Sequence, residues 1–559
     1  MRSPTKMGVP LFVIAVCLVL LNANPAFSQE RFGNLTGTTT DSSGAVVPGA
    51  TVTVINKETN RSLIFRTRDN GTYQAPDIEP GRYSVRFEKP GFSKSEVPNV
   101  VVLVGKTLVV NGKMEVGTLE QTVQVVEASP VIDTTSTMIA KNVTAEELDR
   151  LPKGRSFQGV AILSTSVNTG QIEGGLQING ASSAENNYYV DGVSTTSVLD
   201  GRARQNAVME YIQEVQVKTT GLEAQYGGAL GGVVSAVTKS GGNNYHGAIH
   251  YYYYGNKISA SPTERQQLDP NATVQDKVFY IQDEKQKRDF HEFGGTFGGP
   301  IIKNKLFFFT SASPQWHRAS NFYNLVDGTD SIERKAHRMS WFNKLSFDPT
   351  KKVRTNFTWL YTPQRLTGSL LAYDDIKPNT IVLDKASLQG RKPRGYSQPE
   401  QSYTGQVDLM LTDTSLLSIR GGRYYLNFKE TGIPFDKYYW WQASGVGLNI
   451  PASLQQPSNY ATPSGAKVLY DITTRTYAQA DFSQFLNAFG QHNFKAGFGI
   501  TKNANSVNDS WNGPLGRVQV FPGLSFRGAT GLYGYYSVDD AATNGSTGAN
   551  ILHFYFQDS

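Results

Sequence analysis

The chain has 559 residues, which is too many for one ordinary domain. It contains 54 Gly, 28 Tyr and 29 Phe but a single Cys, and its 53 Lys and Arg nearly balance 47 Asp and Glu. The lone Cys17 excludes a disulfide framework and a thiolate metal site, and the absence of a Lys/Arg-rich run gives little support to nucleic-acid binding. Abundant glycine and aromatic residues predict β-structure with many turns.

The first 28 residues are typical of a cleaved signal peptide. Arg2 and Lys6 supply positive charge, residues 9–21 are almost entirely apolar, and small residues within 26–28 favour cleavage before Gln29. The apolar run is short of the roughly 20 residues that span a bilayer, so we expect cleavage rather than a membrane anchor. Since no later segment is suited to a transmembrane helix, a membrane location requires a β-barrel.

Residues 29–117 predict a small β-sandwich. Residues 51–55 form a β-branched strand, residues 69–71 (Asp-Asn-Gly) a tight turn, and residues 79–83 a second turn that leads into a strand. The stretches GAVVPGA, DNGTY and PGRY resemble the carboxypeptidase-regulatory-like (transthyretin-like) domain. Because the chain has no His-Glu-x-x-His, that resemblance implies a binding or spacing module and not a zinc protease.

Residues 118–242 predict a mixed α/β globular segment. Thr144 and Glu147 are spaced like a helix capping box, and strands and glycine turns follow. Three motifs in matching order resemble the plug domain of TonB-dependent receptors of the Oar-like type, in which a plug follows a carboxypeptidase-like domain. The positions that represent these motifs are Asn179, Gly180, Asp191, Gly192, Tyr226, Gly227 and Gly228.

The resemblance implies a plug that fills a barrel lumen and shifts when a periplasmic TonB-type energy-coupling protein pulls on it. The handle, called the TonB box, would be an extended segment before the plug that pairs edge to edge with a strand of that partner. The matching residues are Glu120, Gln121, Thr122, Val123, Gln124, Val125, Val126 and Glu127. The alternative is that this segment is the last strand of the sandwich, or a linker.

Residues 243–559 predict the first part of a large antiparallel transmembrane β-barrel. Very short turns alternate with long polar connections, a segregation that outer-membrane barrels require and soluble sandwiches do not. In residues 353–359 and 403–409 apolar and polar side chains alternate, as lipid-facing and lumen-facing residues would. Candidate strands are 246–256, 289–299, 305–313, 337–347, 353–362, 402–411, 415–428, 477–488 and 492–502.

Two aromatic clusters and one family resemblance add to the barrel prediction. Residues 251–254 and 307–309 suit aromatic girdles at the membrane edges, and residues 293–309 resemble the first hairpin of Oar-like barrels. Barrels of that family have about 22 strands, and about nine can be identified here. An open edge in lipid leaves backbone groups unpaired, so we expect this sequence to be a fragment of a larger barrel.

No catalytic constellation or cofactor site is predicted. There is no nucleophile elbow or phosphate loop. His246 and His250 would share one face of a strand, but no third ligand is near in sequence, so a lumen-facing or girdle role is preferred and no metal site is predicted. Asp191, Asp539 and Asp540 are interpreted as turn or solvated loop residues, not as calcium ligands.

The sequence therefore predicts a mainly β, non-enzymatic receptor of a Gram-negative-type outer membrane, with its N-terminal domains in the periplasm. As the family resemblance implies, it would transport a small ligand, glycan or peptide, with a mild preference for carbohydrate or peptide. Two alternatives remain open: a surface structural or adhesion protein, and a non-functional truncated receptor. Deletion of residues 120–127 would abolish uptake but not adhesion. An exported soluble enzyme is a distant third, because no active site is found.

Overall fold

A computed structural model describes most of the chain after the predicted signal peptide. The described residues are 32–117, 122–124, 139–150, 157–170, 175–197, 201, 208–222, 229–261, 263–268, 278–282, 287–325, 328–370, 385–441, 451, 460–461, 465–487, 491–529, 531–540 and 542–558. The signal-peptide prediction therefore lies outside the described residues. None of the described helices is long and apolar enough to cross a membrane.

The first body is a β-sandwich. One sheet has the order β4-β1-β7 with β8 also on β1, and the other has the order β3-β2-β5-β6-β9. Tyr73 and Phe87 meet edge to face in the core, with ring centroids 5.7 Å apart. The strands are β1 Gly33–Asp41, β2 Thr51–Asn56, β3 Ser62–Arg66, β4 Thr72–Ile78, β5 Gly81–Glu88, β6 Lys94–Val102, β7 Thr107–Val109, β8 Gly112–Met114 and β9 Thr122–Gln124.

The second body, which we call the plug, is built on a five-stranded sheet with the order β10-β15-β16-β13-β14. Its predicted capped helix is confirmed, since the backbone N–H of Thr144 donates to Glu147 at 2.8 Å. The elements are β10 Ile139–Thr144, α2 Ala145–Arg150, α3 Phe157–Val160, η1 Ala161–Leu163, β11 Val167–Thr169, β12 Leu176–Ile178, η2 Ser183–Glu185, β13 Asn187–Val190, β14 Val193–Ser194, η3 Met209–Tyr211, β15 Ile212–Thr220 and β16 Val233–Thr238.

The third body, which we call the wall, is a 12-stranded antiparallel sheet. Ten strands follow one another in chain order, while β24 (Gln364–Thr367) and β25 (Gly395–Gln398) pair alongside this path. The ten are β17 His246–Gly255, β20 Lys287–Ile302, β21 Leu306–Leu325, β22 Gly328–Thr350, β23 Val353–Tyr361, β26 Glu400–Thr412, β27 Ser415–Thr431, β30 Ala466–Asn487, β31 Gln491–Trp511 and β34 Ala542–Asp558.

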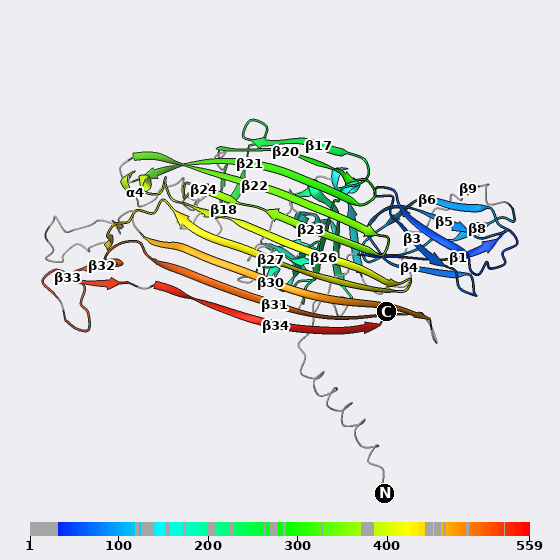
Figure 1. Cartoon of the computed structure of the whole chain (residues 1–559). Coiled ribbons are helices and arrows are strands. Elements are labelled where there is room, and N and C mark those ends of the chain that lie inside the picture. Colours follow the sequence, from blue (N-terminus) through cyan, green and yellow to red (C-terminus); the bar gives the residue numbers. More distant parts are fainter. Residues whose placement is uncertain are drawn as a thin grey trace, which may run out of the picture.

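The long connections of the wall carry small elements of their own. Two small sheets form there: an antiparallel pair of β18 and β19, and a four-stranded sheet with the order β29-β28-β32-β33, in which β28 and β32 are parallel. Figure 1 shows β32, β33 and α4 at one end of the wall and the sandwich at the other. These elements are β18 Arg265–Leu268, β19 Val278–Ile281, α4 Lys385–Gln389, β28 Tyr438–Trp441, β29 Tyr460–Ala461, β32 Arg517–Pro522 and β33 Gly534–Asp539.

The two faces of the wall differ as the alternation predicted. On β23, Arg354, Asn356 and Thr358 are buried, whereas Phe357 between them is 47% exposed. On β26, Thr404, Gln406 and Asp408 are buried and Tyr403 is exposed. Apolar side chains thus point outward and polar ones toward the enclosed side, the inverse of a soluble sheet.

All nine predicted strands are present, with different lengths. β21 and β22 extend well beyond residues 305–313 and 337–347. The connection between the predicted strands 289–299 and 305–313 is shorter than predicted, because β20 continues to Ile302. The mainly β fold class is confirmed.

The plug and the wall share one hydrophobic core. Phe309, Phe342 and Leu360 of the wall belong to the same buried cluster as the plug residues around Tyr211. The rings of Tyr211 and Phe342 stack with centroids 4.5 Å apart. In Figure 1 the plug accordingly lies behind β23, β26 and β27. The enclosed face of the wall is therefore the one that the plug covers.

The sandwich docks on the end of the wall that has the short turns. Arg61 donates to the backbone oxygen of Lys351 at 3.0 Å, in the turn between β22 and β23. Buried Arg354 at the start of β23 pairs with Glu79 of the sandwich at 3.1 Å and with Asp408 of the wall at 2.9 Å. An arginine shared by two carboxylates joins the sandwich to the wall.

Candidate functional site

The described plug-motif residues occupy tight turns. Asn179, Gly180, Asp191 and Gly192 have φ angles of +53°, +81°, +47° and +78°. Asparagine, aspartate and glycine are the residues that tolerate this left-handed region best. Tyr226, Gly227 and Gly228 lie outside the described residues. These motifs therefore fix the plug backbone at two turns.

Asp191 is more than a turn residue, because it is buried at the boundary between plug and wall. Its carboxylate accepts the backbone N–H of Thr238 at 2.8 Å. Lys344 of β22 lies 3.4 Å from Asp191 Oδ2 and donates to Thr238 Oγ1 at 3.0 Å. Asp191 and Lys344 are 5% and 6% exposed. The interpretation of Asp191 as a turn residue holds, but it is not solvated: it forms a buried ion pair with the wall.

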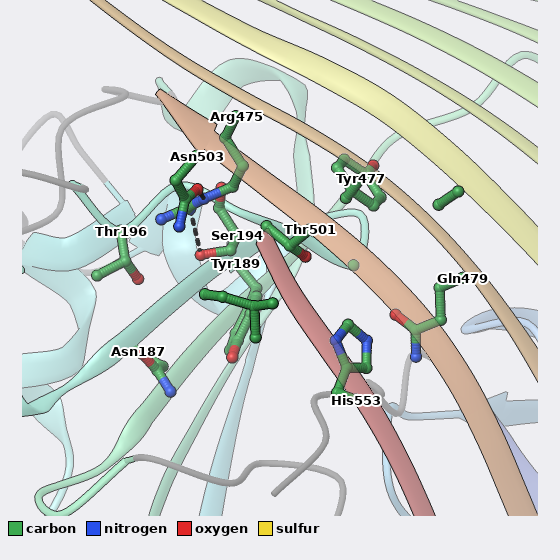
Figure 2. Close-up of a pocket in the computed structure, with 13 residues that line it drawn as sticks. Asn187, Tyr189, Ser194, Thr196, Arg475, Tyr477, Gln479, Thr501, Asn503 and His553 are labelled. Carbon is green, nitrogen blue, oxygen red and sulfur yellow. Dashed lines mark hydrogen bonds between the residues drawn. The ribbon is translucent and has the colours of Figure 1, made fainter. Parts of the chain in front are cut away.

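A cavity of about 210 Å³ lies between the plug and the last strands of the wall. Figure 2 shows plug residues on one side and side chains from β30, β31 and β34 on the other. The lining includes Asn187, Tyr189, Thr196, Tyr477, Gln479 and His553. Amide, phenol and imidazole groups dominate this set, so the cavity can both hydrogen-bond and stack against a polar ligand.

Arg475 crosses this cavity from the wall to the plug. Its guanidinium Nη1 donates to the backbone oxygen of Ser194 at 3.0 Å and to the Ser194 hydroxyl at 2.7 Å (Figure 2). Its Nε donates to Asn503 on the neighbouring strand at 3.1 Å. A fixed guanidinium fork holds β14 of the plug against β30. Any shift of β14 relative to β30 would break these bonds. Arg475 also lines the cavity, so such a shift would change the shape of the cavity.

The centre of the candidate TonB box is paired with the sandwich. Thr122, Val123 and Gln124 form β9, which runs parallel to β6 with Val123 opposite Ser95. The other box candidates, Glu120, Gln121, Val125, Val126 and Glu127, lie outside the described residues. β9 is the last strand in the order of its sheet. The described centre of the segment is thus an edge strand of the sandwich with three residues, as the alternative interpretation expected.

A buried carboxylate joins the sandwich to the plug. Glu214 of β15 is 2% exposed and accepts the backbone N–H of Val104, in the sandwich, at 3.2 Å. Asn142 donates to the same carboxylate. Burial raises the pKa of Glu214 from 4.5 to about 7, against the lowering effect of these hydrogen bonds. The contact between the two bodies therefore depends on a group that titrates near neutrality.

Two family profiles match separate parts of the chain. The carboxypeptidase regulatory-like domain matches residues 34–115, and an outer membrane beta barrel domain matches residues 237–430. The first covers the sandwich, and the second begins at the end of the plug and continues into the wall. The TonB-dependent transporter Oar of Myxococcus xanthus is 31% identical over 318 residues, which is 55% of this chain. Over this stretch the chain is similar to Oar.

The chain is much shorter than this relative, since the match spans 28% of the length of Oar. The outer membrane beta barrel profile supports the outer-membrane location that the sequence predicts. The relative is a transporter and not an enzyme, in agreement with the expectation from the sequence.

Two solved structures align with part of the chain at low sequence identity. The transporter YddB of Escherichia coli aligns with a TM-score of 0.49 and 14% identity, over 75% of this chain and 54% of its own. The siderophore receptor PirA of Acinetobacter baumannii aligns with a TM-score of 0.44 and 14% identity, over 66% of this chain and 48% of its own.

The sequence did not reveal the cavity residues of this chain. Arg475 and Asn503 were just outside the predicted strands 477–488 and 492–502, and nothing in their spacing distinguished them from other polar lumen-facing residues. The sequence feature that could have identified such a residue is a long charged side chain on the polar face of a strand, as at Arg475. A charged group there needs a partner on the enclosed side.

Proposed function

We propose that the chain acts as part of a TonB-dependent outer-membrane receptor that binds a ligand and admits it through the barrel. The observation that supports this most is that the plug lies on the enclosed face of a membrane-type sheet, joined to it by a shared hydrophobic core and by buried polar contacts. The pair Lys344–Asp191 and the bonds from Arg475 to Ser194 are the clearest of them. The similarity to Oar supports the same function.

Energy would come from a periplasm-spanning TonB-type partner that pairs with residues 120–127. Such pairing needs a strand edge whose backbone groups can exchange partners. β9 has three residues and pairs with one neighbour, β6, among the described residues. A pairing this short is weak, so a partner strand can compete with β6 for the same backbone groups.

The experiment is a binding titration between the full chain in detergent and the purified periplasmic domain of the TonB protein from the same cell. We expect Val123→Pro, which removes a backbone donor from the segment, to weaken binding at least tenfold. Ile64→Pro is the matched control, because β3 is the edge strand at the opposite side of the same sheet. Equal binding by the two variants, or by a chain that lacks residues 120–127, would reject the segment as the handle.

For the ligand, we propose a glycan or a peptide bound in the cavity lined by Gln479 and Asn503. Its hydrogen-bonding amides and the rings of Tyr189 and Tyr477 suit polar ligands with apolar faces. The test is binding of the full chain to a panel of oligosaccharides and oligopeptides. Gln479→Ala should weaken binding of the tightest-binding ligand at least tenfold. The control is Gln401→Ala, on the outward face of β26, which should leave that binding unchanged. A hydrophobic ligand as the strongest binder would contradict the proposal.

A further inference from the structure

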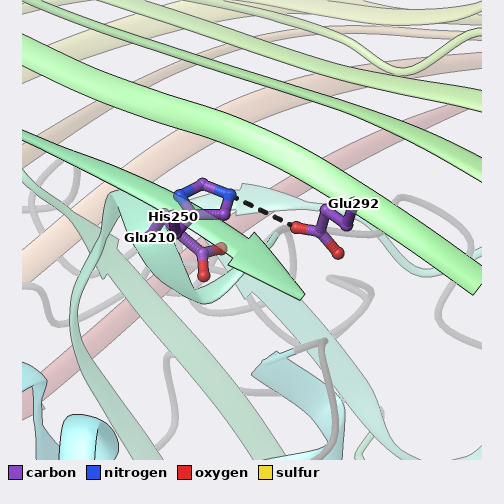
Figure 3. Close-up of side chains that lie close together, drawn as sticks. All are labelled: Glu210, His250 and Glu292. Carbon is purple, nitrogen blue, oxygen red and sulfur yellow. Dashed lines mark ion pairs between the residues drawn. The ribbon is translucent and has the colours of Figure 1, made fainter. Parts of the chain in front are cut away.

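Three side chains from three elements converge where the plug meets the first strands of the wall. Glu210 belongs to η3 of the plug, His250 to β17 and Glu292 to β20. One ligand atom of each lies within 4.8 Å of the others. Figure 3 shows the His250 ring beside the Glu210 carboxylate, with its other side directed at Glu292. Residues far apart in sequence thus form one cluster of possible metal ligands.

Two of the three side chains in this cluster are buried. The side chain of Glu292 is fully buried and that of His250 is 10% exposed. His250 Nε2 lies 3.5 Å from Glu292 Oε1, and the other carboxylate oxygen accepts from Gln315 at 3.2 Å. The ring nitrogen that faces Glu292 is Nε2, so Nε2 is the atom of His250 that would bind an ion in this cluster.

The neighbouring strand leaves room for the imidazole. His250 is directly opposite Gly294 in the pairing of β17 with β20. A Cβ atom at position 294 would lie 2.5 Å from His250 Nε2, so any larger residue there would displace the ring. The ring therefore has a defined position, close to Ser313 Oγ at 3.3 Å. A preformed position of the imidazole favours metal binding, because the side chain loses little conformational entropy when the ion binds.

We propose that Glu210, His250 and Glu292 bind one divalent transition-metal ion, with zinc as the best match. Zinc accepts imidazole nitrogen and carboxylate oxygen as ligands, and sites with three protein ligands are common for it. Ligands about 2 Å from a zinc ion lie roughly 3.4 Å from one another, so a small rotation of Glu210 closes the cluster. The ion would join the plug to the wall, and its binding does not depend on the proposed transport function.

The test uses the full chain in detergent, stripped with a chelator and dialysed against Zn²⁺, with bound metal measured by mass spectrometry. We expect one zinc per chain. Glu210→Gln and His250→Asn should each weaken zinc binding at least tenfold. His291→Asn is the matched control, because it removes a histidine that adjoins Glu292 in β20 but contacts Tyr251 instead. It should bind zinc as the unchanged chain does.

A second measurement separates loss of the site from loss of the fold. Zinc should raise the unfolding temperature of the unchanged chain and of His291→Asn, but not that of Glu210→Gln. Glu210→Gln alters no wall residue and keeps the side-chain size, so its circular dichroism spectrum should be unchanged. The proposal would be overturned if the unchanged chain failed to retain zinc, or if Glu210→Gln or His250→Asn bound zinc as tightly as the unchanged chain does.

Discussion

At the scale of single residues, Glu214 has the clearest dependence on pH. Its pKa is raised from 4.5 to about 7, first of all by burial. The folded chain therefore holds a proton that the unfolded chain releases between these values. Stability from this group is fully present below the unfolded pKa and is lost as pH rises through the folded pKa. The junction between the sandwich and the plug should accordingly become less stable toward neutral pH, because the buried carboxylate then carries a charge.

We predict that the unfolding temperature of the full chain falls between about pH 5 and about pH 8, by the equivalent of at most about 3 kcal/mol. Glu214→Gln should flatten this dependence, because the amide stays neutral throughout. Thermal unfolding followed by circular dichroism measures both. Glu115→Gln, at an exposed glutamate of the sandwich, is the control and should keep the slope. A slope as steep in Glu214→Gln as in the unchanged chain would contradict the assignment.

The buried pair of Asp191 and Lys344 gives a second residue-scale prediction. Lys344→Met removes the cation and leaves the Asp191 charge buried, which costs about 3 kcal/mol in typical cases. Asp191→Asn keeps a residue that tolerates the φ of +47°. In a double-mutant cycle measured by urea unfolding, the double variant should be more stable than the sum of the single changes implies. Additive effects would mean that the two side chains do not interact.

The same pair shows how much of the site the sequence could predict. The turn at Asp191 was predictable, because Asp-Gly after a strand is a local signal. Its partner Lys344 is 153 positions away, and no local pattern joins the two. His250 is similar: the absence of a nearby ligand in the sequence hid Glu210 and Glu292, which only the fold brings close.

At the scale of elements, strands with strong alternation were predicted well and weakly patterned segments were not. β23 and β26 were found almost to the residue. β34 was missed, because its first half is a polar, glycine-containing run without apolar alternation (residues 542–550). The far halves of β21 and β22 were missed for the same reason. These segments are strands because they pair with each other along their full length, which is a non-local cause.

Gly497 of β31 leaves room for the ring of Tyr555 on the neighbouring strand β34. A Cβ at Gly497 would lie 2.0 Å from the ring of Tyr555, and the Tyr555 hydroxyl donates to Asp481 at 3.2 Å. Gly497→Val should therefore displace this ring and lower the unfolding temperature by several degrees, as overpacking does. Gly405→Val is the control, since nothing lies within 4 Å of its Cβ position. The unfolding temperature can be measured from heat-dependent gel migration. An equal decrease in Gly497→Val and Gly405→Val would contradict this role of Gly497.

At the scale of the whole molecule, buried polar contacts join the three bodies. Arg354 connects the sandwich to the wall, Glu214 connects the sandwich to the plug, and Lys344 connects the plug to the wall. The candidate handle β9 lies on the sandwich sheet. A pull on β9 would therefore act first on the sandwich and reach the plug through the junction at Glu214.

The most direct test of this account is photo-crosslinking in living cells from a photoreactive residue placed at Val123. The account predicts a crosslink to the TonB-type partner that decreases when the inner-membrane proton gradient is collapsed. The same residue at Ile64, on the opposite edge strand, should give no such product. A chain that reaches the outer membrane but yields no partner crosslink at position 123, or equal crosslinks at both positions, would contradict engagement of the partner through this segment.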